Sequence, residues 1–204
     1  MTLRISVATG SELQRHIADL ARLRISVFRE YPYLYDGTEA YEARYLQTYT
    51  ASGSAMAVLA FDGETIVGAS TAIPMQDETL AFKQPFIDAG IDPSTLFYCG
   101  ESVLLAQYRG QGIYKRFFAE RENFARKLGG FEHSCFCGVV RPDNDSRRPS
   151  NYMPLDDIWQ HFGYHPRPDL IASFSWTEVG HAQASDHSMM FWIKPLNNGF
   201  PTDD

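Results

Sequence analysis

Gly110 and Gly112 lie between a predicted strand at residues 97–105 and a predicted helix at residues 113–128. Glycine adopts backbone angles that other residues avoid, so the chain can turn sharply there from the strand into the helix. Such a turn presents backbone N–H groups and the positive end of the helix dipole to an anion, for which a phosphate or pyrophosphate is the natural guest. A helix that follows a strand in this way packs against a sheet, so the segment indicates an α/β chain.

The hydrophobic periodicity of the remaining chain agrees with one mixed sheet. The sequence Asp62-Gly63 predicts a hairpin turn, and Ser11 is placed to cap the first helix. We expect one α/β domain over residues 1–204, with a mixed central sheet of about seven strands, helices on both faces, a core at about 3–194 and a short disordered C-terminal tail. Predicted strands cover 3–8, 55–61, 65–73, 97–105, 134–140, 170–179 and 188–194, and predicted helices cover 11–27, 39–49, 79–90, 113–128 and 155–162.

The charge balance argues against a nucleic-acid partner. The chain has 18 Lys+Arg and 25 Asp+Glu, a net charge of −7, whereas binding to a phosphate backbone needs a basic surface. No stretch approaches the ~20 apolar residues of a membrane span, and the first residues lack the apolar run of a secretion signal. We therefore expect a soluble, cytoplasmic protein that binds neither nucleic acid nor membrane.

The cysteines indicate reduced thiols. Cys99, Cys135 and Cys137 are odd in number and have no spacing typical of a disulfide framework. Cys135 and Cys137 with His161 and His165 have a spacing that a zinc site could use, but Cys-x-Cys is not a standard finger pair. Buried small side chains and a surface histidine pair explain these residues, so no metal is expected.

Two familiar phosphate-binding motifs do not fit the glycine turn. A P-loop requires Lys and then Ser or Thr after its last glycine, whereas Ile113 and Tyr114 follow Gly112. A dinucleotide-binding fingerprint requires a third glycine at the position of Lys115, within a first βαβ unit that is not predicted here. The turn therefore belongs to another class of anion site.

The segment Gln107-Tyr108-Arg109-Gly110-Gln111-Gly112 matches the pattern Gln/Arg-x-x-Gly-x-Gly/Ala. With its strand and helix it resembles the signature of the GNAT N-acetyltransferase superfamily. The aliphatic strand 102–105 and a late helix that ends at residues 162–164 follow the family's order, so the resemblance spans most of residues 3–194. It implies a GNAT-like acyltransferase fold and direct transfer of an acetyl group from acetyl-CoA to a primary amine, taken to be that of a small molecule.

The resemblance also implies where acetyl-CoA would bind. In the family the fourth and fifth strands splay apart, and the pantetheine arm lies between them like an extra strand. Main-chain groups around Val103 to Leu105 would hold the pantetheine, and the amides of Arg109 to Ile113 would hold the pyrophosphate. The expected acetyl-CoA contacts are Val103, Leu104, Leu105, Gln107, Arg109, Gly110, Gln111, Gly112, Ile113, Tyr114, Asn144 and Asn151.

The resemblance implies a general base and an acid for the transfer. Glu101, on the predicted fourth strand, is the expected base, although a solvated or ion-paired carboxylate explains it equally well; Tyr98 is a weaker candidate. The family's usual acid is a tyrosine at the position that Trp159 holds here, and an indole is no proton donor for a thiolate. Either Tyr152 or Tyr164 takes this role, or the thiolate leaves unprotonated.

Acceptor recognition is expected at the aromatic loop that carries Tyr31, Tyr33 and Tyr35, although the same tyrosines could cap the core. Two alternatives to a small-molecule acetyltransferase stay open. One is a non-catalytic acyl-CoA-binding or sensor protein, and the other is an enzyme that acetylates a protein lysine or N-terminus. A homodimer is also open, since the apolar run 191–193 suits either a subunit contact or an inward-facing core strand.

Overall fold

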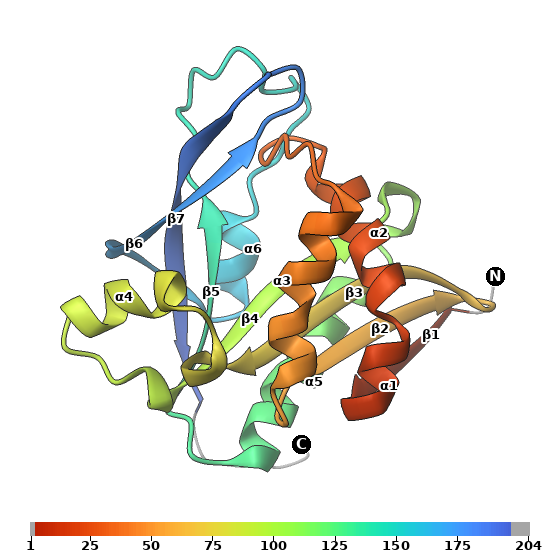
Figure 1. Cartoon of the computed structure of the whole chain (residues 1–204), viewed down its shortest axis with the longest axis vertical. Helices are drawn as coiled ribbons and strands as arrows, with labels where there is room; N and C mark the ends of the chain where they lie inside the picture. Colours follow the sequence, from red (N-terminus) through yellow and green to blue (C-terminus); the bar gives the residue numbers. More distant parts are fainter. Residues whose placement is uncertain (1–2, 197–204) are drawn as a thin grey trace.

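The computed structural model describes residues 3–196. Its centre is a seven-stranded sheet in the order β1-β2-β3-β4-β5-β7-β6, which Figure 1 shows nearly face-on. All neighbouring strands are antiparallel except the pair β4 and β5, so the predicted mixed sheet is confirmed. The strands are β1 (Leu3–Thr9), β2 (Met56–Asp62), β3 (Thr65–Pro74), β4 (Leu96–Leu104), β5 (His133–Val139), β6 (His165–Thr177) and β7 (Ala184–Pro195).

Helices cover both faces of the sheet. In Figure 1 the helices α1 to α4 lie in front of it and α5 and α6 lie behind it. Three short 3₁₀ turns, η1 to η3, lie in the connections between these elements. The bounds are α1 (Gly10–Arg15), α2 (Ile17–Phe28), α3 (Glu39–Ala51), η1 (Met75–Asp77), α4 (Leu80–Asp88), η2 (Pro93–Thr95), η3 (Ala106–Tyr108), α5 (Ile113–Leu128) and α6 (Asp156–His161).

The sheet separates two apolar cores. Leu59 and Phe191 pack toward α1 to α4, whereas Phe117 of α5 packs with Trp192 against the other face. Phe191 and Trp192 are neighbours on β7 and face opposite cores, as the alternation of a strand requires. Because β7 lies inside the sheet, the run 191–193 is accounted for by these cores; a homodimer stays a prediction.

The prediction of one continuous helix over residues 11–27 is wrong. The helix divides at His16, whose ψ of 7° departs from helical geometry, into α1 and α2. The expected cap is also wrong, because the helix begins at Gly10, with a φ of 51°, and Thr9 occupies the N-cap position without a side-chain hydrogen bond. Apolar spacing does not detect such a break, since Leu13 and the buried residues of α2 still face the same core.

The other corrections concern strand ends. The hairpin turn consists of Gly63 and Glu64, one residue later than expected, because Asp62 still pairs with Thr65. Both β6 and β7 are longer than predicted. The extra residues of β6 include prolines, which a strand tolerates at a sheet edge. The C-terminal tail was predicted to follow residue 194. Its residues 197–204 lie outside the described residues, so the prediction is not tested there. Within residues 3–196, no helix combines the length and the apolarity needed to cross a membrane.

Candidate active site

The strands β4 and β5 are paired only at their beginnings. Residues 96–98 of β4 pair with residues 133–135 of β5, and the two strands then diverge. We call the unpaired parts, residues 99–104 of β4 and 136–139 of β5, the β4/β5 fork. In an ordinary parallel pair, the two strands exchange evenly spaced hydrogen bonds along their whole length. The fork therefore leaves main-chain donors and acceptors on two facing edges inside the sheet.

The neighbouring ladders determine which main-chain groups face the fork. Leu105 donates its N–H to Val67 at 3.0 Å, so alternation turns Val103 and Leu105 toward β3 and turns Ser102 and Leu104 toward the fork. Of the predicted segment 103–105, only Leu104 presents its main chain there. On β5, the bond from the Val140 N–H to Ser188 places the main chains of Cys137 and Val139 on the fork side. These residues and Ser102 were not among the predicted contacts.

The glycine turn, residues 109–112, leads from β4 and η3 into α5. Gly110 and Gly112 have φ of 75° and 77°, and a Cβ at either position would contact nothing within 4 Å. The backbone angle, and no close neighbour, therefore requires glycine. Arg109 braces the turn, because its Nε donates to the Leu104 carbonyl at 3.2 Å and its Nη2 lies 2.9 Å from Glu30 Oε2.

The N–H groups of residues 110–115 have no hydrogen-bond acceptor within the described chain. The first N–H groups of a helix lack intrahelical partners, and here the turn adds its own donors to those of α5. Consecutive free donors at a helix N-terminus bind phosphate groups well. A hydrogen bond also closes the turn: the side-chain amide of Gln111 donates to the main-chain carbonyl of Gln107 at 3.2 Å.

Glu101 extends from β4 to the side of α2 and α3. Its carboxylate forms an ion pair with Arg24, which also donates to Glu42 at 2.5 Å. The Tyr45 hydroxyl lies 3.4 Å from Glu101 Oε2, and the Tyr35 hydroxyl donates to Glu42 at 2.8 Å. Glu101 is 5% exposed. One oxygen of Glu101, Oε2, is therefore ion-paired, as one of the two sequence-based interpretations expected. The other oxygen, Oε1, has no hydrogen-bond partner among the described residues.

These groups, Arg24, Tyr35, Glu42, Tyr45 and Glu101, form what we call the Glu101 network. Burial alone would lower the pKa of Arg24, but the charges of Glu101 and Glu42 outweigh burial and raise it. Arg24 therefore stays charged, and one cation faces two carboxylates. The network has an excess negative charge inside the protein, which a proton or a bound cation would neutralise.

Tyr49 connects this network to Gly100, which lies in β4 where the fork begins. Its hydroxyl lies 3.3 Å from that of Tyr45 and occupies the space where a Cβ of Gly100 would stand. Any larger residue at position 100 would displace this hydroxyl, so the close approach explains the glycine. The nearby Thr71 Oγ1 has no hydrogen-bond partner among the described residues. Thr71 is also the register partner of Glu101 on the neighbouring strand, so two paired residues of β3 and β4 each have an unpartnered polar atom.

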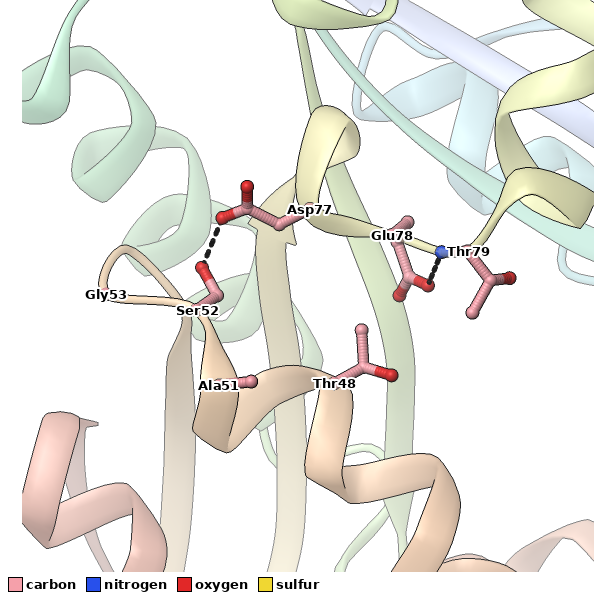
Figure 2. Close-up of a pocket in the computed structure, with 7 residues that line it drawn as sticks. All are labelled: Thr48, Ala51, Ser52, Gly53, Asp77, Glu78 and Thr79. Atoms are coloured by element: carbon pink, nitrogen blue, oxygen red, sulfur yellow. Dashed lines mark hydrogen bonds between the residues drawn. The ribbon is translucent and has the colours of Figure 1, made fainter.

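Glu78 lies at the far side of Tyr49, after η1. It is 3% exposed, and its Oε2 accepts from the Thr79 N–H at 3.1 Å, while its Oε1 has no partner among the described residues. Burial raises the pKa of Glu78 to about 7, despite opposing contributions from Thr79 and Tyr49. Glu78 lines a pocket of about 470 Å³ between the end of α3 and η1. Figure 2 shows its carboxylate among the other lining residues.

This pKa predicts a pH-dependent stability. An unfolded chain releases the Glu78 proton near pH 4.5, whereas the folded protein keeps it until about pH 7, so the free energy of unfolding falls as the pH rises between these values. In Glu78→Gln this contribution is absent. We expect chemical denaturation to show that the variant gains on the order of 3 kcal/mol relative to the wild type between pH 4 and pH 8. A constant difference across this range would contradict the burial of an ionisable Glu78.

Tyr164 and Glu101 lie on opposite faces of the sheet. The Tyr164 side chain is fully buried with α5, and its hydroxyl contacts Ser134 at 2.8 Å and Glu122 at 3.2 Å. Burial raises its pKa well above the usual value. Its hydrogen bonds are therefore used inside the core, and we infer a packing role for Tyr164.

Trp159 of α6 instead holds another tyrosine. Its Nε1 donates to the Tyr114 hydroxyl at 2.9 Å, and its ring would lie 3.0 Å from a Cβ at Gly138 of the fork. Burial raises the pKa of Tyr114, which therefore keeps its own proton at neutral pH. The Trp159–Tyr114 pair thus places a hydroxyl donor beside β5, and no local sequence pattern connects residues 45 positions apart.

The three loop tyrosines do not share one surface. Tyr35 is buried in the Glu101 network, and Tyr33 packs on Phe28 with ring centroids 4.5 Å apart. Tyr31 instead meets Tyr152 of the loop between β5 and α6 at 4.7 Å. Tyr31 and Tyr152 therefore form one half-buried aromatic pair beside this loop. Asn144 and Asn151, on the same loop, are exposed.

All three cysteines are buried and free. Burial raises the pKa of the Cys99, Cys135 and Cys137 thiols, so they stay protonated at neutral pH. No group of three or more His, Cys, Asp or Glu side chains in residues 3–196 could hold a metal ion.

Known structures share this fold at low identity. An acetyltransferase of the GNAT family from Staphylococcus aureus Mu50 is 11% identical and has a TM-score of 0.59, over 96% of this chain and 99% of its own. A GCN5-related N-acetyltransferase from Kribbella flavida is 14% identical with a TM-score of 0.56, over 95% and 97%. The protein yncA from Salmonella typhimurium, whose structure contains its cofactor acetyl-CoA, is 11% identical with a TM-score of 0.57, over 100% and 99%. Neither a family model nor a curated protein matches the sequence.

Proposed function

We propose that this chain, which has the fold of the GNAT acetyltransferases, transfers an acetyl group from acetyl-CoA to the primary amine of a small molecule. The observation that carries the proposal is the row of free N–H groups at residues 110–115, next to a fork with unpaired main-chain edges. A pyrophosphate would accept from these N–H groups. The amides of a pantetheine arm would then pair with the main chains of Ser102 and Leu104 on one edge and of Cys137 and Val139 on the other.

Glu101 is the proposed base. The amine must lose a proton to attack the thioester, and Glu101 Oε1 is a carboxylate oxygen without a hydrogen-bond partner in the described chain. The nitrogen then forms a bond to the acetyl carbon, the carbon–sulfur bond breaks, and the nitrogen loses its second proton, which replaces the one that the acid gives to the leaving thiolate. We propose Tyr114 as the donor that protonates the leaving thiolate, because Trp159 binds the Tyr114 oxygen and leaves its O–H free.

The charge of the site supports a cationic acceptor. The two negative charges of Glu42 and Glu101 outnumber the single positive charge of Arg24. This excess of negative charge favours an ammonium ion over a neutral or anionic group. We propose that the pair of Tyr31 and Tyr152 lines the acceptor side, because both rings lie beside the same loop. Their half-buried rings would contact an apolar or aromatic part of the amine.

Ligand-dependent stabilisation tests the acetyl-CoA site. A ligand that binds only the folded state adds ~2.7 kcal/mol to the free energy of unfolding at a hundredfold excess over its Kd. We expect thermal denaturation to show this with acetyl-CoA and CoA and to show no shift with NAD or ATP. Failure of both CoA species to shift the transition would contradict the proposed function.

Two glycine variants locate the ligand. Gly112→Ala and Gly63→Ala each force alanine into a positive φ, 77° and 59°, with no atom within 4 Å of the new Cβ. Both should therefore lower stability by a similar ~1 kcal/mol. Only Gly112→Ala should also reduce the shift that CoA produces, since Gly63 lies in the hairpin turn between β2 and β3.

The ion pair of Glu101 with Arg24 favours a second candidate function, a protein that binds acyl-CoA without catalysis. Release of free CoA thiol in the presence of a panel of primary amines separates the two. Turnover with any amine supports the transferase. A thermal shift with acetyl-CoA, combined with no turnover across the panel, would favour the binding protein.

A further inference from the structure

A line of polar side chains runs from the fork to the surface pocket beside η1. The Tyr45 hydroxyl lies 3.4 Å from Glu101 Oε2 and 3.3 Å from the Tyr49 hydroxyl. Tyr49 lies close enough to Glu78 to lower the pKa of that carboxyl. Because Tyr45 and Tyr49 lie one turn apart on α3, the helix itself holds the two hydroxyls in line. Two hydroxyl groups thus lie between Glu101 and Glu78; hydrogen-bond distances join the first three groups of the line, and Tyr49 lies near Glu78 without a hydrogen bond to it among the described residues.

The pocket end of this line is open to water, whereas the fork end is buried. Thr48, Ser52 and Asp77 line the pocket with Glu78, and the Ser52 hydroxyl donates to Asp77 at 2.5 Å. In Figure 2 the Glu78 carboxylate points into the space above Thr48, away from Asp77. Its Oε1 has no partner among the described residues although only 3% of the residue is exposed. A buried, unpartnered oxygen at the wall of a pocket is placed to exchange a proton with solvent.

We propose that Glu78 is the exit for the proton that the reaction releases, and that Tyr45 and Tyr49 carry this proton from Glu101 to Glu78. This inference rests on the proposed function, because the proton comes from the acceptor ammonium. Glu101 is buried and cannot hand a proton directly to bulk water. The tyrosines are therefore positioning and relay residues, and Glu78 is the terminal proton acceptor.

The relay balances in protons and charge. The substrate ammonium loses one proton to Glu101, which becomes neutral. Rotation of the neutral Glu101 carboxyl group brings this proton beside Tyr45, which accepts it and donates its own proton to Tyr49. The Tyr49 hydroxyl then turns toward Glu78 and passes its proton to the carboxylate. Glu101 is negative again, Glu78 is neutral, and both tyrosines are unchanged. Glu78 then releases the proton to water in the pocket.

The acidities of the groups agree with this direction. Burial raises the pKa of Tyr45 and Tyr49 well above the usual value, so both keep an O–H to donate at neutral pH. Glu78, with a pKa of about 7, both takes and releases a proton near neutrality. The titratable or charged groups that act on Glu78 or lie beside it are Tyr45, Tyr49, Asp77, Arg24, Tyr98, Glu101 and Cys137.

The pH dependence of kcat tests the relay in the full chain, with acetyl-CoA and an amine from the panel. In the wild type, kcat should rise with pH through about 7, because Glu78 must be ionised to accept the proton. Glu78→Gln and Tyr49→Phe should each lower kcat by about 10²-fold. In Glu78→Gln this rise should also disappear. Added imidazole, a small diffusible base, should restore part of the activity of Glu78→Gln by entering the pocket.

Matched variants separate the relay from damage to the fold. Asp77→Asn removes the neighbouring pocket carboxylate and should keep the wild-type kcat and its pH profile, and Glu78→Asp should keep the rise with pH. All variants should show the wild-type thermal shift with acetyl-CoA. A wild-type profile in Glu78→Gln would overturn the relay and leave the transferase intact. Absence of turnover in the wild type would overturn the proposed function and the relay together.

A readout without turnover tests the coupling itself. The carboxyl carbon of Glu78, followed by carbon-13 NMR against pH, should titrate at a lower pH in Glu101→Gln than in the wild type. The reason is that the charge of Glu101 raises the pKa of Glu78. An unchanged midpoint would mean that the two carboxylates do not sense each other, and the relay would be wrong.

Discussion

Replacing Arg24 with methionine is expected to lower the free energy of unfolding by about 3–5 kcal/mol, because it leaves buried carboxylates without their counter-charge. Arg24 is the shared partner of Glu42 and Glu101, and the Glu42 side chain is completely buried. Methionine preserves the unbranched shape of the side chain and its helix propensity, so the lost charge dominates the effect. Urea denaturation near pH 7 measures the change.

An arginine two residues away on the same helix provides the control. Arg22 pairs with Asp19 at 2.7 Å, but both side chains are substantially exposed. Arg22→Met should therefore cost less than about 1 kcal/mol. If Arg24→Met cost no more than Arg22→Met, the Glu101 network would not be the buried ionic cluster described above.

Glu101→Gln is expected to lower kcat for acetyl transfer by about 10²–10⁴-fold, because the amide cannot take a proton from the acceptor ammonium. The change is nearly isosteric and keeps an oxygen that can accept from Arg24. Thiol release at saturating acetyl-CoA measures kcat. The thermal shift with acetyl-CoA should stay at its wild-type size, since the proposed acetyl-CoA contacts do not include the Glu101 side chain.

Glu42→Gln is the matched control for this experiment. It also removes one carboxylate from Arg24, but Glu42 lies on α3 and contacts Tyr35 instead of the fork. Its kcat should stay within about tenfold of the wild type. Equal losses in the two variants would indicate that the charge of the network matters and that Glu101 has no separate role as a base.

The sequence carried most of the information needed for the fold. Periodicity located all seven strands of the sheet, and α5 begins and ends where the glycines at both of its ends predicted. What it missed depends on tertiary context. The break at His16 leaves the apolar face of the helix unchanged, and the added residues of β6 are polar or proline positions that only a sheet edge accommodates.

The candidate site was less predictable, because its groups come together through the fold. Arg24 and Glu101 are 77 residues apart, and nothing near either residue announces the other. The late-helix ending indicated a tyrosine acid, yet the Tyr164 hydroxyl is fully buried and already bonded to Ser134 and Glu122. Gly100 could be recognised as a glycine inside a strand, but its reason, the Tyr49 hydroxyl above it, exists only in the packed structure.

The three residue pairs that join β4 to β5 also determine how the molecule can deform. They connect one half-sheet, β1 to β4, with another, β5, β7 and β6, and they lie at one end of both strands. Because β4 and β5 pair only there, we expect the two half-sheets to be held together more firmly at Tyr98 than near Leu104. A guest that bonded to both edges would also hold them together near Leu104. Binding of such a guest would then fix the position of α2, which packs on one half-sheet, relative to α6, which lies beside the other.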